Sequence, residues 1–196
     1  PDSIPAHHRS SIGGPLEGLV DHPAVVGFMD EFVANGYASE NCYGFRLEST
    51  FSTIRSKGHD NFQPHGGRGI LNFPGNSHTY HMDHDRAHSG LTRVVWELNP
   101  VQRGDGGTLF LTGSHKGAYP PPASTADRNS NLWEDYECSA GSALIFTEAI
   151  THTGNRWENE RVDRVAIFNC YNVVGNKWYK WDPHPQHLQE MPFKRQ

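Results

Sequence analysis

Residues 141–172 read GSALIFTEAITHTGNRWENERVDRVAIFNCYN and hold two short apolar runs on either side of a polar stretch. The first run covers residues 143–146 and the second covers residues 165–168. Apolar runs of this length, bounded by polar and turn-forming residues, indicate buried β-strands. We therefore predict two strands joined by a polar turn, with His152 at the start of the turn and Arg164 at its end.

His152 and Arg164 would face one cavity if the two strands form a hairpin. A neutral imidazole can bind a divalent metal ion, and a planar guanidinium can hold a carboxylate with two parallel hydrogen bonds. Arg156 and Arg161 lie nearby in the sequence. Arg164 is preferred because it directly precedes the second apolar run, so that its head can point inward, and its fork suits a carboxylate better than lysine would.

The composition predicts one β-rich domain. A chain of 196 residues corresponds to a single domain, and 20 glycines and 13 prolines with 35% hydrophobic residues are typical of strands joined by long loops. A net charge of −5 without a basic block argues against nucleic acid or an anionic membrane as a partner. No apolar run approaches the roughly 18 residues of a transmembrane helix. Three irregularly spaced cysteines indicate reduced thiols, so a cytoplasmic protein is expected.

Three segments are expected along the chain. Residues 1–20 form a poorly ordered lead-in, residues 21–175 form the folded domain, and residues 176–196 form a tail rich in Trp, Lys, His and Pro. The domain opens with a helix that covers the sheet. Asp21 is the expected N-cap of this helix, and Pro23 suits its first turn.

Further strands and loops follow the helix, which should end at Asn35-Gly36. A polar stretch without clear periodicity, residues 59–90, indicates a long loop of the kind that lines active sites. A second excursion, residues 119–135, is rich in Pro, Ser and Asn and is expected at the surface. The remaining strands are expected at residues 43–47, 51–55, 92–98 and 108–111.

A second informative segment covers residues 99–117 and reads NPVQRGDGGTLFLTGSHKG. The two segments together resemble the phytanoyl-CoA dioxygenase-like family of iron(II)- and 2-oxoglutarate-dependent oxygenases. Thr112 stands where that family usually has proline. In the family an iron-binding histidine is followed about a dozen residues later by the arginine that holds 2-oxoglutarate. The resemblance runs from about residue 21 to 172 and assigns these roles to His152 and Arg164.

The resemblance implies a fold and an activity. The fold would be all-β or β-rich, a double-stranded β-helix (jelly roll, cupin-like) with a few flanking helices. The activity would be a dioxygenase reaction with Fe(II), 2-oxoglutarate and O₂. It would hydroxylate an unidentified small molecule and release succinate and CO₂. No catalytic residue beyond the metal ligands is expected, because the cofactor carries the chemistry. Trp96 is expected beside the cofactor, with Phe110 and Phe168 as further cavity walls. The oligomeric state stays open.

Two segments compete to supply the remaining metal ligands. A His-Met-Asp triplet from His81 to Asp83 matches the family's His-x-Asp pattern, and alternate residues of an extended strand share a face. Residues 51–67, FSTIRSKGHDNFQPHGG, instead resemble a branch of the family that carries His-Gly-Gly here and FTEAxTH later, which this chain has as FTEAITH. We favour His65 because its surroundings match, and His81 with Asp83 stays as the alternative.

If His65 is a ligand, the carboxylate position falls on Gly67, which has no side chain. Glu148, four residues before His152, could supply the carboxylate, or it could orient His152 through the free ring N–H. Asp83, water or a halide are the other options for this position. A halide would make the protein a related 2-oxoglutarate-dependent halogenase. A degenerate iron site would make it a non-catalytic jelly-roll binding module.

Overall fold

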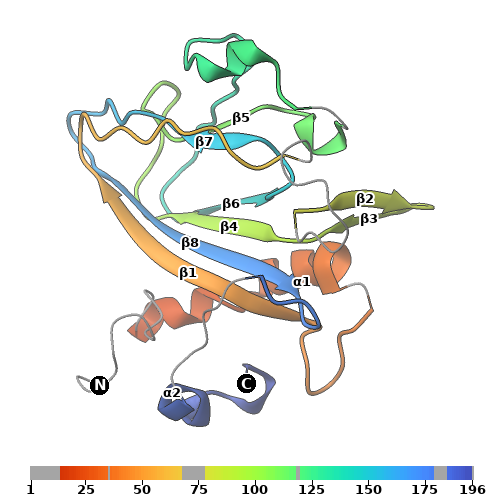
Figure 1. Cartoon of the computed structure of the whole chain (residues 1–196). Coiled ribbons are helices and arrows are strands. Elements are labelled where there is room, and N and C mark those ends of the chain that lie inside the picture. The colour runs from red at the N-terminus through yellow and green to blue at the C-terminus, as the bar shows by residue number, and fades with distance from the viewer. Residues whose placement is uncertain (1–13, 35, 68–77, 118–119, 179–184, 196) are drawn as a thin grey trace.

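The computed structural model describes residues 14–34, 36–67, 78–117, 120–178 and 185–195 (Figure 1). Its strands are β1 (Phe45–Arg55), β2 (Tyr80–Asp83), β3 (Arg86–Ser89), β4 (Thr92–Glu97), β5 (Thr108–Phe110), β6 (Ser142–Thr147), β7 (His152–Gly154) and β8 (Arg164–Val173). Its α-helices are α1 (Pro23–Met29) and α2 (Pro185–Glu190), with a π-helical turn at Asp30–Ala34. Short 3-10 helices lie at Gly14–Leu19, Ser114–Lys116, Ala123–Ala126 and Phe193–Arg195.

The strands form two layers, with a smaller one over a curved larger sheet (Figure 1). The larger sheet is antiparallel and has the order β1-β8-β4-β6. In the smaller layer β5 pairs with β7. Two isolated bridges widen this layer, because His65 pairs with His152 of β7 and Phe110 of β5 pairs with Glu134. Side chains from the larger sheet and from the β5–β7 layer can therefore meet in the space between the two layers.

The two strands expected in residues 141–172 are present as β6 and β8, but they do not form a hairpin. β4 lies between them, and Trp96 is paired with Ala143 of β6 on one side and with Ile167 of β8 on the other. The polar stretch that connects them leaves the larger sheet and supplies β7 to the smaller layer. The hairpin prediction is wrong because apolar runs indicate strands without specifying the partner of each strand.

The main apolar core lies between the larger sheet and α1. Val25 and Met29 of α1 are fully buried there against side chains of β4 and β8, including Trp96 and Tyr171. The Trp96 ring also packs edge-on against His22, with 5.4 Å between ring centroids. The prediction that Trp96 lines the cofactor cavity is therefore corrected, because alternation along β4 turns its side chain toward the helix.

The first helix begins as predicted at a proline in its first turn, but its cap differs. The Nδ1 atom of His22 accepts the capping hydrogen bond from the backbone N–H of Ala24 at 3.3 Å. Asp21, the expected cap, instead accepts hydrogen bonds from the Tyr43 hydroxyl at 2.9 Å and from Arg195. A distant tertiary contact thus outweighs the local capping preference of aspartate.

The expected loop at residues 59–90 contains the β2–β3 hairpin, and residues 68–77 lie outside the described residues. The hairpin has no apolar alternation in its sequence, and it turns at His84, whose φ is 55°.

Other expectations concern the chain ends and the thiols. Residues 1–13 of the expected lead-in and residues 179–184 and 196 of the expected tail lie outside the described residues. All three cysteines are free thiols, as predicted. Among the described residues, no helix has the length and apolar character needed to cross a bilayer.

Candidate metal centre

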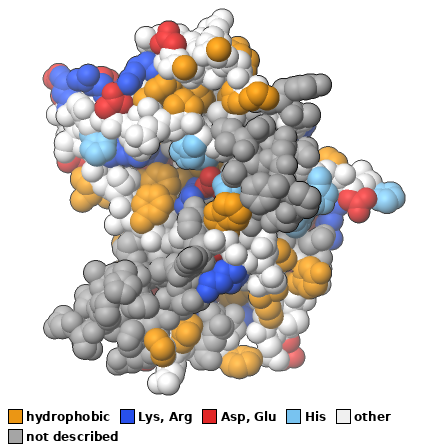
Figure 2. Space-filling view, viewed as in Figure 1, with side chains coloured by type: hydrophobic (Ala, Val, Ile, Leu, Met, Phe, Trp, Pro, Cys, Tyr) orange, Lys and Arg blue, Asp and Glu red, His pale blue; other side chains and the backbone are white. Residues whose placement is uncertain are grey.

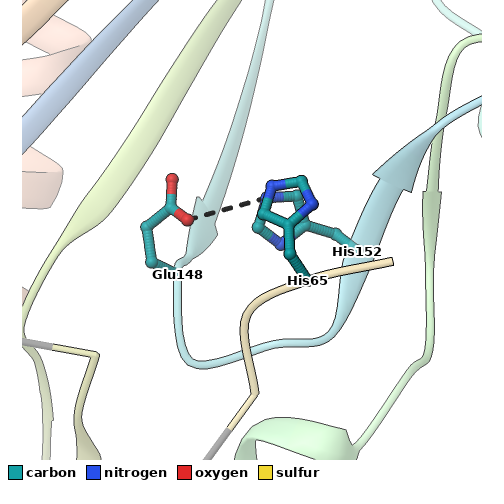
Figure 3. Close-up of side chains that lie close together, drawn as sticks. All are labelled: His65, Glu148 and His152. Carbon is teal, nitrogen blue, oxygen red and sulfur yellow. Dashed lines mark ion pairs between the residues drawn. The ribbon is translucent and has the colours of Figure 1, made fainter. Parts of the chain in front are cut away.

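Three side chains from two segments converge between the layers, with His65 on one segment and Glu148 and His152 on the other (Figure 3). His65, Glu148 and His152 each offer one ligand atom, and these atoms all lie within 4.8 Å of one another. The Nε2 atom of His152 is 3.6 Å from Oε2 of Glu148, and the two imidazole centroids are 4.3 Å apart. In the part of the chain that the structure describes, this is the only such group of three or more His, Cys, Asp or Glu side chains.

Backbone hydrogen bonds fix the positions of the two histidines. His65 and His152 exchange a pair of antiparallel N–H to O=C bonds of 3.0 and 2.9 Å. Directly paired residues in antiparallel strands project their side chains to the same face. The backbone N–H of Thr151 donates to Oγ of Ser114 at 2.7 Å. The Gly-Ser-His-Lys segment and the turn that carries Glu148 are therefore held together next to the metal centre.

Glycines follow His65 because the chain passes too close to the 148–152 turn for any side chain. Gly66 has a φ of +76°, and a Cβ there would lie 2.6 Å from the carbonyl oxygen of Ile150. Gly67 has a φ of +81°, and a Cβ there would lie 2.4 Å from Oγ1 of Thr151. An aspartate at position 67 would thus be both strained and obstructed.

Hydrogen bonding sets the tautomer of both imidazoles. Nδ1 of His65 is 2.7 Å from the carbonyl oxygen of Gln63, and Nδ1 of His152 is 2.9 Å from that of Ile150. A carbonyl oxygen only accepts, so each Nδ1 carries the proton and each Nε2 keeps its lone pair. Burial lowers the pKa of His152 to about 4, which keeps this imidazole neutral at pH 7. Both rings are thus prepared to ligate a metal through Nε2.

Glu148 is buried and paired with Arg93 of β4. Nε and Nη2 of Arg93 lie 2.7 and 2.6 Å from Oε1 of Glu148, which leaves Oε2 on the side of His152. Burial acts to raise the pKa of Glu148, but the Arg93 charge outweighs burial and the pKa is lowered. Glu148 is therefore a carboxylate with one oxygen oriented by Arg93 and the other turned toward the imidazoles. Sequence analysis missed Arg93, although a cation inside an apolar strand is a signal for such a partner.

The alternative ligands His81 and Asp83 lie on the projecting β2–β3 hairpin, where histidine and acidic side chains gather (Figure 2). Both residues are exposed. Oδ1 of Asp83 is 2.8 Å from Nδ1 of His84, and the His81 ring faces that of His88 with centroids 4.9 Å apart. The structure therefore does not bring this triplet to the candidate centre. The literal His-x-Asp match arose in a segment that is rich in both residue types.

Arg164 points into the space between the layers, as the sequence predicted, but it already has partners there. Its Nε lies 3.2 Å from both carboxylate oxygens of Glu97, and its Nη2 lies 2.5 Å from Oε1. Nη2 also approaches Oγ1 of Thr108 at 3.1 Å and the Tyr136 hydroxyl at 3.0 Å. The guanidinium carbon lies 5.5 Å from the centre of the Phe168 ring. Glu97 is a second charged residue of β4 that sequence analysis missed.

Aromatic rings occupy the interior beside these polar groups. Phe146 lies edge-on to the His152 ring and to Phe110, with both pairs of centroids 4.9 Å apart. Phe168 stacks on Phe51 at 4.8 Å. The two predicted cavity walls, Phe110 and Phe168, are half-buried, and each lies beside a polar group of the interior, Phe110 near His152 and Phe168 near Arg164.

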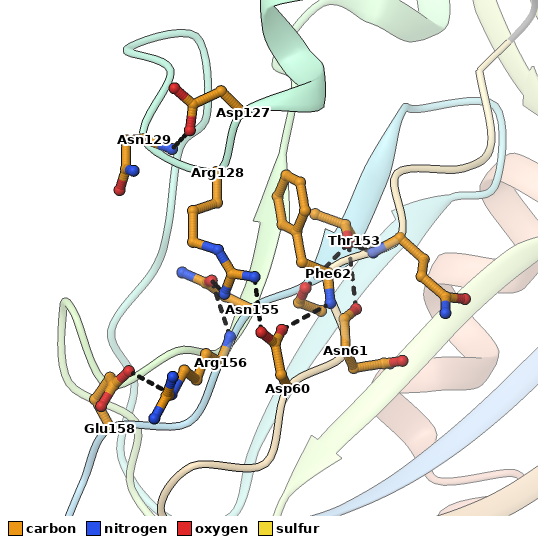
Figure 4. Close-up of polar contacts among 12 residues, drawn as sticks. Asp60, Asn61, Phe62, Asp127, Arg128, Asn129, Thr153, Asn155, Arg156 and Glu158 are labelled. Carbon is orange, nitrogen blue, oxygen red and sulfur yellow. Dashed lines mark hydrogen bonds and ion pairs between the residues drawn. The ribbon is translucent and has the colours of Figure 1, made fainter.

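Polar contacts of Arg128, here called the polar strap, hold the outer loop at residues 120–135 (Figure 4). Nη2 of Arg128 forms an ion pair with Asp60 at 2.7 Å, and its Nη1 donates to Asn155 at 3.4 Å. The Arg128 guanidinium also covers the Phe62 ring, 5.1 Å from its centroid. The strap therefore joins the expected surface excursion to the segment that leads to His65 and to the segment after β7.

Comparison with known proteins identifies the family. The chain matches the sequence profile of the family described as "Phytanoyl-CoA dioxygenase (PhyH)" over residues 30–166. Two uncharacterized proteins, from Mycobacterium bovis and Mycobacterium tuberculosis, are each 30% identical to it over 91 residues, which is 45% of this chain. The match spans 32% of each relative, about a third of their length.

Solved structures agree on the fold. HygX from Streptomyces hygroscopicus with nickel and 2-oxoglutarate bound superposes with a TM-score of 0.69 at 19% identity, covering 90% of this chain and 75% of HygX. The non-heme alpha ketoglutarate dependent epimerase SnoN from nogalamycin biosynthesis gives 0.52 at 14% identity, covering 81% of this chain and 57% of SnoN. The two layers are accordingly those of a double-stranded β-helix. With its profile match spanning most of the chain, the protein belongs to the phytanoyl-CoA dioxygenase (PhyH) family.

Proposed function

We propose that the protein is a non-haem Fe(II)- and 2-oxoglutarate-dependent dioxygenase that hydroxylates a small molecule with O₂ and releases succinate and CO₂. The observation that carries this proposal is the convergence of His65, Glu148 and His152. Two neutral imidazoles and one carboxylate on one side of a metal are the donor set of non-haem iron oxygenases, which keep further positions open for substrates. HygX has been crystallised with iron bound, which agrees with this choice of metal.

The residues around the centre suit the proposed ligands. Bound iron(II), with 2-oxoglutarate, would supply the oxidising chemistry. The chain's own groups would hold and shield it. Carbonyl oxygens keep both Nε2 atoms directed away from their own turns. Arg93 keeps Glu148 ionised. Arg164 has one buried nitrogen, Nη1, without a hydrogen-bond partner among the described residues, and a carboxylate of 2-oxoglutarate would satisfy it.

The halogenase and binding-module alternatives receive less support. Both were motivated by Gly67, which removes the carboxylate of the His-x-Asp pattern. Glu148 supplies a carboxylate within the same group, so neither a halide nor the loss of iron is required by the residues present. Chloride-independent turnover without a chlorinated product would agree with the dioxygenase proposal.

The test is an anaerobic titration of Fe(II) and 2-oxoglutarate, read by the weak visible band at roughly 500 nm that reports chelation at a facial iron site. We expect the wild-type band to be lost in His65→Ala, Glu148→Ala and His152→Ala. The matched control is His81→Ala, which removes an exposed histidine and should keep the band. A wild-type protein that binds no iron, or a band lost with His81 and kept without His65, would contradict the proposal.

A further inference from the structure

Arg55 is the last residue of β1, and two nitrogens of its buried guanidinium lack a hydrogen-bond partner among the described residues. Its side chain is largely enclosed, at 7% exposure. Nε and Nη1 of Arg55 have no hydrogen-bond partner among the described residues. Arg55 is the direct cross-strand neighbour of Arg164 in the β1–β8 pairing. Side chains at such positions lie about 5 Å apart at Cβ, so two guanidiniums share one region of the interior.

Among the described residues, Glu97 is the carboxylate that acts on both arginines. Glu97 takes the Nε and Nη2 edge of Arg164, and it also accepts a hydrogen bond from the Tyr136 hydroxyl at 2.5 Å. Burial and the nearby Arg164 charge lower the pKa of Arg55, yet a guanidinium stays charged at neutral pH. One buried positive charge is therefore left over, and its free donors point to an anion.

The space beside Gly154 shows where the Arg55 guanidinium lies relative to the candidate metal centre. His152 and Gly154 are alternate residues of β7, so they share a face and lie about 7 Å apart. A Cβ on Gly154 would lie 2.6 Å from Nη1 of Arg55, which means that the guanidinium occupies the space a side chain would fill. The Arg55 guanidinium thus lies about one strand repeat, roughly 7 Å, from the Cβ position of His152 on the same face, and 2-oxoglutarate is long enough to span such a distance.

We propose that Arg55 and Arg164 together hold the distal carboxylate of 2-oxoglutarate. This inference rests on the proposed function, because it needs the keto-acid end of the molecule at the metal. Glu97 explains why a second guanidinium is needed. With one edge of Arg164 occupied, only its Nη1 remains, whereas tight carboxylate binding uses two or more converging donors. Arg55 supplies the missing donors.

The test compares two keto acids on protein loaded anaerobically with Mn(II). 2-Oxopentanoate has the carbon chain of 2-oxoglutarate, but a methyl group replaces the distal carboxylate. Calorimetry should show that wild type prefers 2-oxoglutarate. Arg55→Met should weaken 2-oxoglutarate binding by about 10- to 100-fold, the effect of losing a charge-assisted hydrogen bond, and leave 2-oxopentanoate binding unchanged. The matched control is Arg103→Met, which removes an exposed arginine paired with Asp135 and should change neither affinity.

The outcomes separate this inference from the proposed function. If Arg55→Met keeps the wild-type preference for 2-oxoglutarate, the two-arginine site is wrong while the dioxygenase proposal stands. If metal-loaded wild type binds neither keto acid, the dioxygenase proposal itself fails. Without ligand, Arg55→Met should melt at the wild-type temperature or above, since it removes an unpaired buried cation. A large fall in melting temperature would instead assign Arg55 a structural role and overturn the inference. Arg55→Lys, which keeps the charge without the fork, should retain part of the preference.

Discussion

Single residues in this site are constrained by their neighbours more than by their own chemistry. Gly66 and Gly67 follow a metal-ligand candidate, and Gly67 stands at the carboxylate position of the family's His-x-Asp pattern. Both are glycines because the 148–152 turn lies against them. The carboxylate comes from Glu148 on that same turn. The close approach that excludes a side chain at position 67 therefore also brings the substitute carboxylate within reach of His65.

A pair of glycine substitutions tests this argument. Gly66→Ala combines a left-handed φ with a contact of 2.6 Å to backbone oxygen, whereas Gly104→Ala has a similar φ of +82° and open space around it. We expect Gly104→Ala to cost about 1 kcal/mol from backbone strain, and Gly66→Ala to cost about 2 kcal/mol or more and to abolish iron binding. Urea unfolding and iron titration measure both effects. Equal destabilisation by the two substitutions would show that the close approach has no energetic consequence.

At the scale of elements, the β2–β3 hairpin and the polar strap differ in how they join the domain. The hairpin projects with exposed histidines and acids, whereas the segment around Arg128 is tied to two others by its contacts with Asp60 and Asn155 (Figures 2 and 4). Because this strap contacts the chain before His65 and the chain after β7, it links the outer loop to both strands of the backbone bridge between His65 and His152.

Removing the strap should loosen the loop without unfolding the domain. Arg128→Ala breaks a solvent-exposed ion pair, which contributes little to stability, and a stacking contact with Phe62. We expect faster amide hydrogen exchange in residues 123–135 and little change in the urea midpoint. Arg103→Ala, at an exposed arginine paired outside the strap, is the control. Unchanged exchange in the loop would show that Arg128 does not hold it.

Over the whole molecule, a polar contact joins the two ends of the described chain. Asp21, just before α1, accepts hydrogen bonds from Arg195 near the C-terminus and from Tyr43. Burial alone would raise the pKa of Asp21, but the bonds from Arg195 and Tyr43 outweigh burial and the pKa is lowered from its ordinary value of 3.8. The ionised form of Asp21 thus stabilises the folded protein.

This contact predicts a pH dependence with a definite sign. Because the folded-state pKa lies below 3.8, the contribution of Asp21 is present above that pH and is lost as the pH falls through the folded-state value. The stability difference between wild type and Asp21→Asn should be largest near neutral pH and should shrink in acid. Urea unfolding at pH 6 and pH 3 measures this difference in the free energy of unfolding. We expect about 1 kcal/mol at pH 6, because the ion pair is partly exposed. A difference that is independent of pH would contradict the assignment.

The sequence by itself determined the main strands and the family, and it indicated two inward-facing residues that we propose for the site. Apolar runs marked β4, β6 and β8 because burial demands apolar side chains wherever the chain runs. The order of a histidine, a polar stretch and an arginine before a strand indicated His152 and Arg164. Both turn inward in the structure, because each flanks a strand whose direction its own neighbours set.

Only the tertiary structure decided what those elements meet. It placed β4 between β6 and β8, turned Trp96 toward the helix, and brought His65 rather than His81 next to His152. It also joined Arg93 to Glu148 and set Arg55 beside Arg164. The physical reason is that strand pairing, the face that a side chain takes and the neutralisation of buried charge all depend on residues far apart in the chain. A local pattern records that a residue is buried, but not which distant group meets it.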